Sequence, residues 1–198
     1  MLQLGQPHTK QEIAAAFVAE FTAVHDFFAG IDGEKFLAAP EGVWSPAENL
    51  VHLIKSCAPV IMALGLPKTA LRIRFGWVRH ETRTLAQVRY TYVNEALAGG
   101  GRAGGPFVPE GIEPTADAQS RILTKWQDKG NELQAALKKW SDQALDHYVL
   151  PHPLLGKMTV REILFFTLYH NLHHVNDVQR LLNLPESEWF AQAEPMEK

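Results

Sequence analysis

The sequence has little of the features that mark several specialised classes of protein. It has one cysteine, Cys57, in 198 residues, which excludes an internal disulfide framework and favours a reducing compartment, so we expect a cytoplasmic protein. No apolar run approaches the roughly 18–20 residues of a membrane span. The first residues also lack the basic start and apolar stretch of a secretory signal. We therefore expect no membrane partner.

The sequence also has little excess of positive or negative charge. The net charge is −3, whereas nucleic-acid binders gain affinity from many cationic contacts with phosphates. We therefore do not expect nucleic acid as a partner. The remaining composition is that of an ordinary globular protein, with 46% hydrophobic and 21% charged residues. One hydrophobic core can organise a chain of 198 residues, so we expect a single domain over residues 1–198.

Three helix starts carry the same signature. Thr9, Ser45 and Thr159 are each followed three residues later by Glu, and then by apolar residues at helical spacing. In this capping box the hydroxyl accepts from an early backbone N–H, while the Glu accepts from the backbone N–H of the cap residue. No convincing strand alternation and no internal repeat are visible. We predict four long helices, over 9–29, 45–65, 116–146 and 159–183.

A further segment separates the second and third of these helices. The spacing of Leu85, Val88 and Tyr92 predicts another helix over about 80–98, and a stretch rich in Gly and Pro follows over 98–115. That stretch lacks the preceding strand and the Lys-Ser or Lys-Thr of a phosphate-binding loop, so we interpret it as a crossover loop, with a lid over the site as the alternative. The expected fold class is all-α, an up-down-type four-helix bundle with this insertion between helices 2 and 3.

His170 and His174 are the strongest candidates for a chemical site. Residues four apart on a helix differ by about 40° in direction, so both imidazoles can reach one metal ion. His173 diverges from His170 by about 60° and is the reserve ligand. A His-x-x-x-His pair alone is more often surface or packing histidine. The zinc proteases are excluded, because Asn171 stands where they have a general-base Glu.

The second predicted helix offers a third ligand, His52. Its neighbours Leu53 and Ile54 are apolar, so His52 is expected to point inward or to the edge of a groove. Three imidazole nitrogens are a common way to hold zinc and related ions. The alternative is a buried histidine with one hydrogen bond.

Two segments resemble a known family. Residues 44–53, Trp-Ser-Pro-Ala-Glu-Asn-Leu-Val-His-Leu, resemble the second-helix signature of the DinB-like superfamily of four-helix-bundle metalloproteins, and residues 152–182 resemble its last loop and helix. The resemblance implies a metal site of His52, His170 and His174 with a fourth position open for water or substrate. Zinc or nickel is the expected divalent ion, and nitrogen ligands also suit iron, cobalt or manganese.

The candidates for acid-base chemistry are Asp177 and Glu48. The family often shows Gly-Gln shortly after its last His, whereas this chain has Asn176 and Asp177. Asp177 lies about one turn beyond His174, so it either accepts an N–H from a ligand imidazole or a bound water, or forms a surface pair with Arg180. Glu48 is the other carboxylate near the expected site.

Three other features have weaker signals. His25, late in the first predicted helix, is more typical of a core or surface histidine than of a ligand. Cys57 is five residues from His52 on the same helix, which points it elsewhere. The basic stretch 68–93 either attracts an anionic substrate or nucleic acid, or forms a solvated face or dimer rim, and we favour the second interpretation.

A bound metal of this kind polarises a substrate oxygen, or lowers the pKa of a bound water or thiol. Known DinB-like members include transferases and isomerases that use low-molecular-weight thiols. The resemblance therefore implies a metal-dependent hydrolase or low-molecular-weight-thiol transferase, with a small-molecule substrate such as a thiol. The alternative is a non-catalytic, stress-related binding or scaffold protein with the same bundle.

The aromatic content predicts a homodimer. The chain has five Trp and ten Phe, and one bundle core is not expected to hold all of its large rings. Surplus aromatic area tends to lie at interfaces. The argument rests on four tryptophans, Trp77, Trp126, Trp140 and Trp189.

Overall fold

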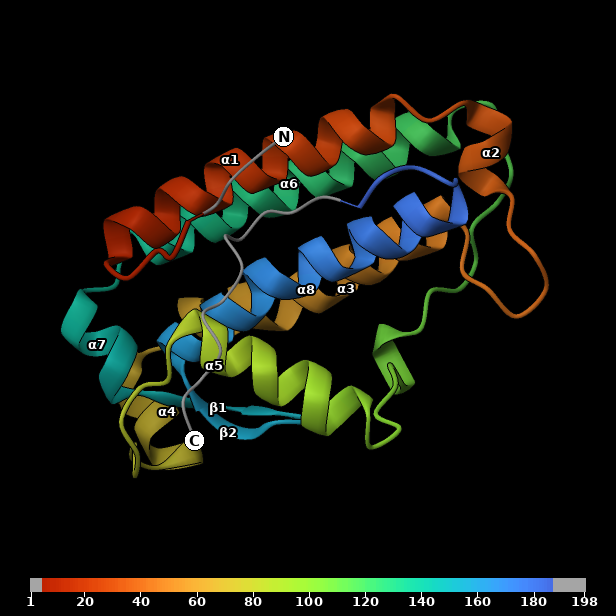
Figure 1. Ribbon diagram of the computed structural model, residues 1–198. Helices are drawn as coiled ribbons and strands as arrows, with labels where there is room; N and C mark the ends of the chain where they lie inside the picture. The colour runs from red at the N-terminus through yellow and green to blue at the C-terminus, as the bar shows by residue number, and fades with distance from the viewer. Residues whose placement is uncertain (1–4, 187–198) are drawn as a thin grey trace.

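Four long helices form the body of the molecule in a computed structural model, which describes residues 5–186 (Figure 1). They are α1 (Lys10–Ala29), α3 (Pro46–Gly65), α6 (Ala118–Leu137) and α8 (Val160–Leu181). The short elements between them are α2 (Gly33–Leu37), α4 (Lys68–Phe75), α5 (Leu85–Tyr90), the π-helix η1 (Thr91–Leu97), the 3-10 helix η2 (Gly105–Phe107), α7 (Asp142–His147), β1 (Val149–His152) and β2 (Gly156–Thr159). The prediction of an all-α bundle is confirmed.

Side-chain caps begin three of the four long helices. The capping boxes predicted at Thr9, Ser45 and Thr159 all form, with both hydrogen bonds of each box present. A fourth box, at Thr84 with Gln87 as its partner, begins α5 and was not among the predicted starts. These caps satisfy backbone N–H groups that have no partner inside the helix, so the starts are fixed locally.

The directions of the helices follow from their end contacts. Gln119, at the start of α6, donates to the carbonyl of Phe28 near the end of α1 at 2.9 Å. The indole N–H of Trp140, just beyond α6, donates to the carbonyl of Leu64 near the end of α3 at 3.0 Å. Helix α6 is therefore antiparallel to α1 and parallel to α3. The order is up-down-down-up, and the long insertion 66–117 makes the parallel pair possible.

The predicted third helix and the predicted helix of the insertion are both shorter than expected. Helix α6 ends at Leu137, and Ser141 then caps the separate helix α7, so the prediction of one helix over 116–146 was wrong in its second half. The predicted helix over 80–98 begins only at Leu85 and changes to π-helical winding at Thr91. Ser141 restarts the chain as α7 in the first case, and the cap at Thr84 sets a later start in the second. Apolar periodicity reveals neither cap.

Strands β1 and β2 form a small antiparallel hairpin before α8. Val149 pairs with Thr159 and His152 with Gly156, whose φ of 71° favours glycine. The sequence analysis found no strand here, because strands of four residues are too short to show alternation. The hairpin sets the start of α8, since Thr159 both ends β2 and caps that helix.

Helix α3 has an unusual amount of apolar surface. Among the described helices it alone is long and apolar enough, by length and composition, to cross a membrane, with 44% of the tested window buried. A core helix of a bundle passes the same test, and α3 packs against α6 and α8. A single helix of this kind is weak support for a membrane span.

Candidate metal centre

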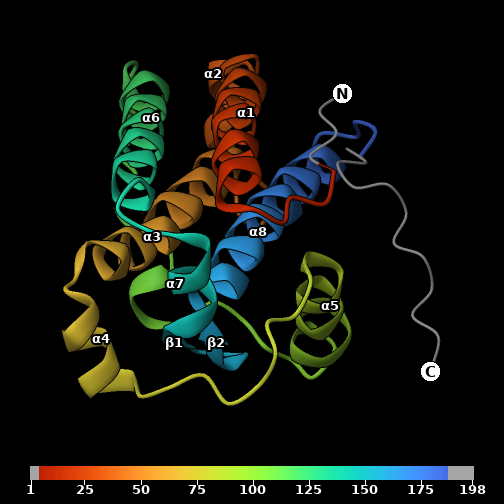
Figure 2. The ribbon, with the colours of Figure 1, turned by 90° about the vertical axis from the view of Figure 1, so that its left-hand side faces the viewer.

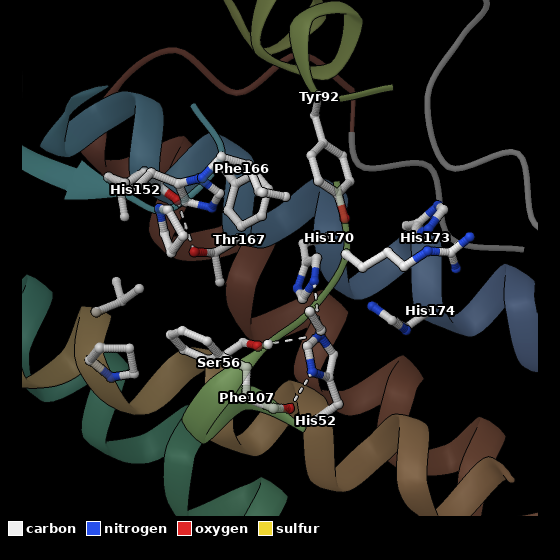
Figure 3. Close-up of a pocket in the computed structure, with 18 of the residues that line it drawn as sticks. His52, Ser56, Tyr92, Phe107, His152, Phe166, Thr167, His170, His173 and His174 are labelled. Carbon is white, nitrogen blue, oxygen red and sulfur yellow. Dashed lines mark hydrogen bonds between the residues drawn. The ribbon is translucent and has the colours of Figure 1, made fainter. Parts of the chain in front are cut away.

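Three histidines from two helices meet inside the bundle (Figure 3). His52 comes from the second turn of α3, and His170 and His174 come from successive turns of α8. One possible ligand atom of each lies within 4.8 Å of the others, and the Nε2 atoms of His52 and His170 are 3.1 Å apart. Nitrogens bound to one ion at about 2 Å lie roughly 3–4 Å apart. Within residues 5–186 this is the only such cluster.

Hydrogen bonds fix which nitrogen each of two rings presents. The Nδ1–H of His52 donates to the carbonyl of Phe107 at 2.8 Å, and the Nδ1–H of His174 donates to Oδ1 of Asn49 at 2.8 Å. The amide of Asn49 is itself oriented, because its Nδ2 donates to the carbonyls of Trp44 and Ser45 at 3.1 and 3.0 Å. Each imidazole therefore has Nε2 left for a metal ion.

Burial keeps these imidazoles neutral. The three residues are 3%, 6% and 7% exposed, in chain order. Burial, with the neighbouring imidazoles second, lowers the pKa of His170 and of His174 well below the usual value, and burial also lowers the pKa of His52. A neutral imidazole is the form that binds a metal. Three neutral imidazoles, two of them oriented by hydrogen bonds, fit a divalent ion.

The comparison with protein families agrees with this geometry. The model of the DinB superfamily matches residues 16–178. The chain belongs to the DinB superfamily. No curated protein and no solved structure matches it. The matched region contains α3 and nearly all of α8, and so all three histidines of this DinB protein.

The reserve ligand His173 lies outside the cluster. Its Nε2 is 3.7 Å from Oδ2 of Asp177, and its ring packs edge-on to Tyr92 with centroids 5.9 Å apart. His173 still borders the cavity, but its direction on α8 diverges from that of His170 and His174, as the helical spacing predicts.

The two candidate carboxylates are both engaged elsewhere. Asp177 forms an ion pair with Arg180, and its Oδ2 is 3.6 Å from Nδ1 of His174, whose hydrogen bond goes to Asn49. Glu48 accepts from the backbone N–H of Ser45 at 2.7 Å as part of the capping box. Asp177 borders the cavity beside the histidines, whereas Glu48 does not.

Three residues of the site were not predicted from the sequence. Asn49 and the Phe107 carbonyl orient two of the histidines, and the Tyr92 hydroxyl points toward His170 and His173 (Figure 3). Asn49 stands inside the family-like segment, so a signal existed for it. A backbone carbonyl leaves no sequence signal. Tyr92 lies in the π-helix η1, and such windings are frequent at functional sites.

The Gly- and Pro-rich loop contributes to the site. Besides the Phe107 contact, the carbonyl of Val108 accepts from Nζ of Lys55 on α3 at 2.7 Å. Arg102 and Gly104 border the cavity next to the histidines. Of the two interpretations of 98–115, a plain crossover and a cover over the site, these contacts favour the second.

The weaker candidates lie outside the histidine cluster. The His25 ring contacts its neighbour Asp26 at 3.1 Å, and Cys57 is buried, which raises the pKa of its thiol. In the basic stretch, Arg72 stacks over Trp77 at 3.5 Å and Arg83 pairs with buried Glu162 at 3.0 Å. Part of the basic charge therefore has structural partners.

Proposed function

We propose that this DinB-superfamily protein is a metal-dependent enzyme that acts on a small molecule through His52, His170 and His174. The observation that carries the proposal is that the three histidines border a cavity of about 1480 Å3. An ion there has protein ligands on one side and space for a substrate on the other, which is typical of catalytic rather than structural sites. Hydrolysis or transfer of a low-molecular-weight thiol are the two reaction classes. Zinc or nickel is the preferred ion, with iron, cobalt or manganese as alternatives.

The chain's residues have separable tasks in this proposal. A bound metal supplies a Lewis acid that polarises an oxygen, or lowers the pKa of a water or thiol. Asn49 and the Phe107 carbonyl hold two imidazoles in the tautomer that leaves Nε2 free. Tyr92 and Asp177 both border the histidine end of the cavity, where a hydroxyl can donate a hydrogen bond and a carboxylate can accept one.

Metal analysis of protein purified without a histidine tag tests the proposal, followed by a screen of small thiols, electrophiles and hydrolysable esters and amides. We expect close to one equivalent of a transition metal, and turnover that is lost in His52→Ala. Protein that takes up no metal contradicts the proposal.

A second candidate is a non-catalytic binding or scaffold protein. It is favoured by the engagement of Asp177 with Arg180 and of Glu48 with the cap of α3, which leaves neither carboxylate uncommitted for acid-base work. Full metal occupancy with no turnover across the screen supports this candidate.

We also propose a homodimer, on a narrower basis than the aromatic content alone suggested. Trp126 and Trp140 both fit in the core, with their indole N–H groups bonded to Phe21 and Leu64 carbonyls. Trp77 remains 47% exposed, and Trp189 lies outside the described residues. Light scattering that gives the 22.2 kDa of one chain at all dilutions contradicts the dimer.

A further inference from the structure

The cavity beside the histidines extends far beyond what three ligands and one ion need. Its volume of about 1480 Å3 exceeds the roughly 300–1,000 Å3 of most small-molecule sites. His52, near the start of α3, and Leu66, just beyond its end, both border it. A helix rises about 1.5 Å per residue, so this length of α3 spans about 20 Å. The cavity is therefore an elongated trough along α3, with the histidines near one end.

Away from the histidines the trough is largely apolar. Side chains from α3, from the hairpin and from the first turns of α8 border it, among them Val60, Met62, Ala63, Leu150, Leu154 and Ile163. Met62 is 65% exposed, so apolar surface remains in contact with water. This arrangement explains why α3 is apolar on more than its core-facing side. Covering such a surface with an apolar ligand is favourable, because apolar area leaves water.

The charges around the trough are predominantly positive. Its one acidic residue, Asp177, is paired with Arg180. Arg102 lies on the loop side, and Arg74 lies at the end of α4, which α3 leads into directly (Figure 2). Neither Arg74 nor Arg102 pairs with a carboxylate within residues 5–186. An apolar trough with uncompensated cations selects ligands that combine an apolar body with a negative charge.

We propose that the substrates are elongated amphiphilic anions. Their apolar body, an alkyl chain or a row of rings, lies along α3 between Val60 and Leu66. Their anionic group lies near Arg74, and the group that reacts lies at the histidines. The position of the reacting group rests on the proposed metal-dependent function, whereas the binding of the apolar body and of the anion does not.

The direct test is calorimetry on the metal-loaded protein with butanoate, octanoate and dodecanoate, below the micelle concentration. We expect the dissociation constant to fall by about two- to fourfold for each added methylene, the upper figure corresponding to about 0.8 kcal/mol per buried CH2. Dodecyltrimethylammonium, a cation of the same chain length, is expected to bind at least about tenfold more weakly, since it meets arginines. Equal binding of the three carboxylates, or of the cation and dodecanoate, overturns the proposal.

Paired variants locate the binding. Ala63→Trp fills the trough, and Ala58→Trp adds the same ring at an exposed position of α3 outside it. We expect Ala63→Trp to weaken dodecanoate at least about tenfold while butanoate and metal content stay unchanged. Ala58→Trp is expected to change none of them. If both variants weaken dodecanoate equally, the chain does not lie along α3.

Two further variants test the effect of charge along the trough without placing a large side chain in the protein core. Met62→Glu, at an already exposed position, places an acid in the trough, so it should weaken dodecanoate and strengthen the dodecyl cation. Arg74→Ala should weaken dodecanoate up to about fivefold, the size of an exposed ion pair, while Arg79→Ala outside the trough should not. An Arg74→Ala protein that binds dodecanoate normally overturns the placement of the anion.

Metal removal separates this inference from the proposed function. Protein stripped of metal with a chelator should keep the dependence on chain length and on Ala63. If it does and no metal rebinds, the proposed function fails while amphiphile binding stands. If metal binds stoichiometrically but the dependence on chain length is absent, the inference fails alone.

Discussion

Two helix pairs in the same bundle bury opposite kinds of side chain. Where α1 faces α6, Phe21 stacks on Trp126 with centroids 4.1 Å apart, and Gly130 lies so close that a Cβ there would be 2.7 Å from the Phe21 ring. Where α3 faces α8, His52 and His174 are buried, together with Asn49 and His170. One interface is aromatic and closely packed, and the other is lined by imidazoles.

The difference assigns stability and chemistry to separate interfaces. Burial of apolar rings is favourable, whereas burial of polar groups is unfavourable unless each finds a partner. Two of the three histidines have such a partner on Nδ1, whereas the Nε2 atoms of His52 and His170 face each other at 3.1 Å. The α1–α6 interface therefore stabilises a site that contributes little to folding by itself. Substitutions on the two sides should separate unfolding from loss of metal.

The largest effect is expected from Trp126→Ala on the aromatic side. The variant removes a fully buried ring and leaves the Phe21 carbonyl without its indole donor. We expect the free energy of unfolding to fall by about 3–5 kcal/mol, measured by urea titration, with metal retained by the folded fraction. Trp77→Ala, at a half-exposed ring, should cost less than about 1 kcal/mol. Equal losses in the two variants would contradict the contrast between the interfaces.

His174→Ala tests the other side. Removing one of three ligands should lower metal affinity by at least about 100-fold, while circular dichroism stays helical, because the apolar faces remain. A lower melting temperature in the presence of metal is expected, since the ion binds only the folded state. His173→Ala is the matched control and should retain metal. Metal that is lost in His173→Ala and kept in His174→Ala would show that the ligand pair is wrong.

Asn49→Ala gives a smaller loss at the same site. The substitution leaves Nδ1 of His174 without its acceptor and frees the ring to rotate. Loss of such an orienting partner typically lowers metal affinity about 10–100-fold, which competition with a chromophoric chelator measures. Asn131→Ala, on the exposed side of α6, serves as the control. Unchanged affinity in Asn49→Ala would mean that Asp177 orients His174 instead.

The contrast between the interfaces also separates what the sequence can predict from what it cannot. Local patterns were sufficient to predict the capping boxes at Thr9, Ser45 and Thr159. The spacing of His170 and His174 was sufficient to predict that both lie on one face of their helix. His52 required the family resemblance, because nothing local relates α3 to α8. The relative directions of the helices could not be predicted either, because they depend on contacts between residues far apart in the sequence, such as that of Trp140 with Leu64.

Contacts made by the backbone escaped prediction entirely. The carbonyl of Phe107 orients His52, yet any residue at that position would present the same oxygen. The interruption between α6 and α7 depends on Ser141 acting as a cap, which competes with an apolar pattern that continues through it. The hairpin depends on cross-strand pairs such as Val149 with Thr159, which a four-residue pattern does not reveal.

Glu20 is an exception to the contrast between the aromatic interface and the polar interface. It is a fully buried acid on α1, and its Oε2 accepts from Nδ2 of Asn171 on α8 at 3.0 Å. Its Oε1 and the Asn171 Oδ1 are the buried side-chain atoms of the described residues that lack a hydrogen bond. Burial raises the pKa of Glu20 well above 4.5. A proton on Glu20 would supply the donor that both oxygens lack.

The raised pKa makes stability depend on pH. Above pH 4.5, the ordinary value, the unfolded chain releases this proton while the folded protein keeps it. The contribution of Glu20 to the free energy of unfolding is therefore full below pH 4.5. As the pH rises from there toward the raised pKa of the folded state, this free energy falls by up to about 1.4 kcal/mol per pH unit. Glu20→Gln, whose amide replaces the protonated acid, should remove this slope in urea titrations of metal-free protein between pH 5 and 8. Equal slopes in the two proteins would show that Glu20 is not protonated on folding.

The smallest effect is expected at Glu48, which separates the cap of α3 from the chemistry of the site. Glu48 accepts from the backbone N–H of Ser45 and does not border the cavity. Gln supports the same capping box, so Glu48→Gln should change stability by less than about 0.5 kcal/mol, whereas Glu48→Ala should cost about 1 kcal/mol. Metal content should be unchanged in both, and so should any turnover found for the natural protein. Glu48→Gln could instead abolish turnover without changing the melting temperature or the metal content. The carboxylate would then have a role in the reaction that its hydrogen bond to Ser45 does not explain, and the site would extend to the N-terminus of α3.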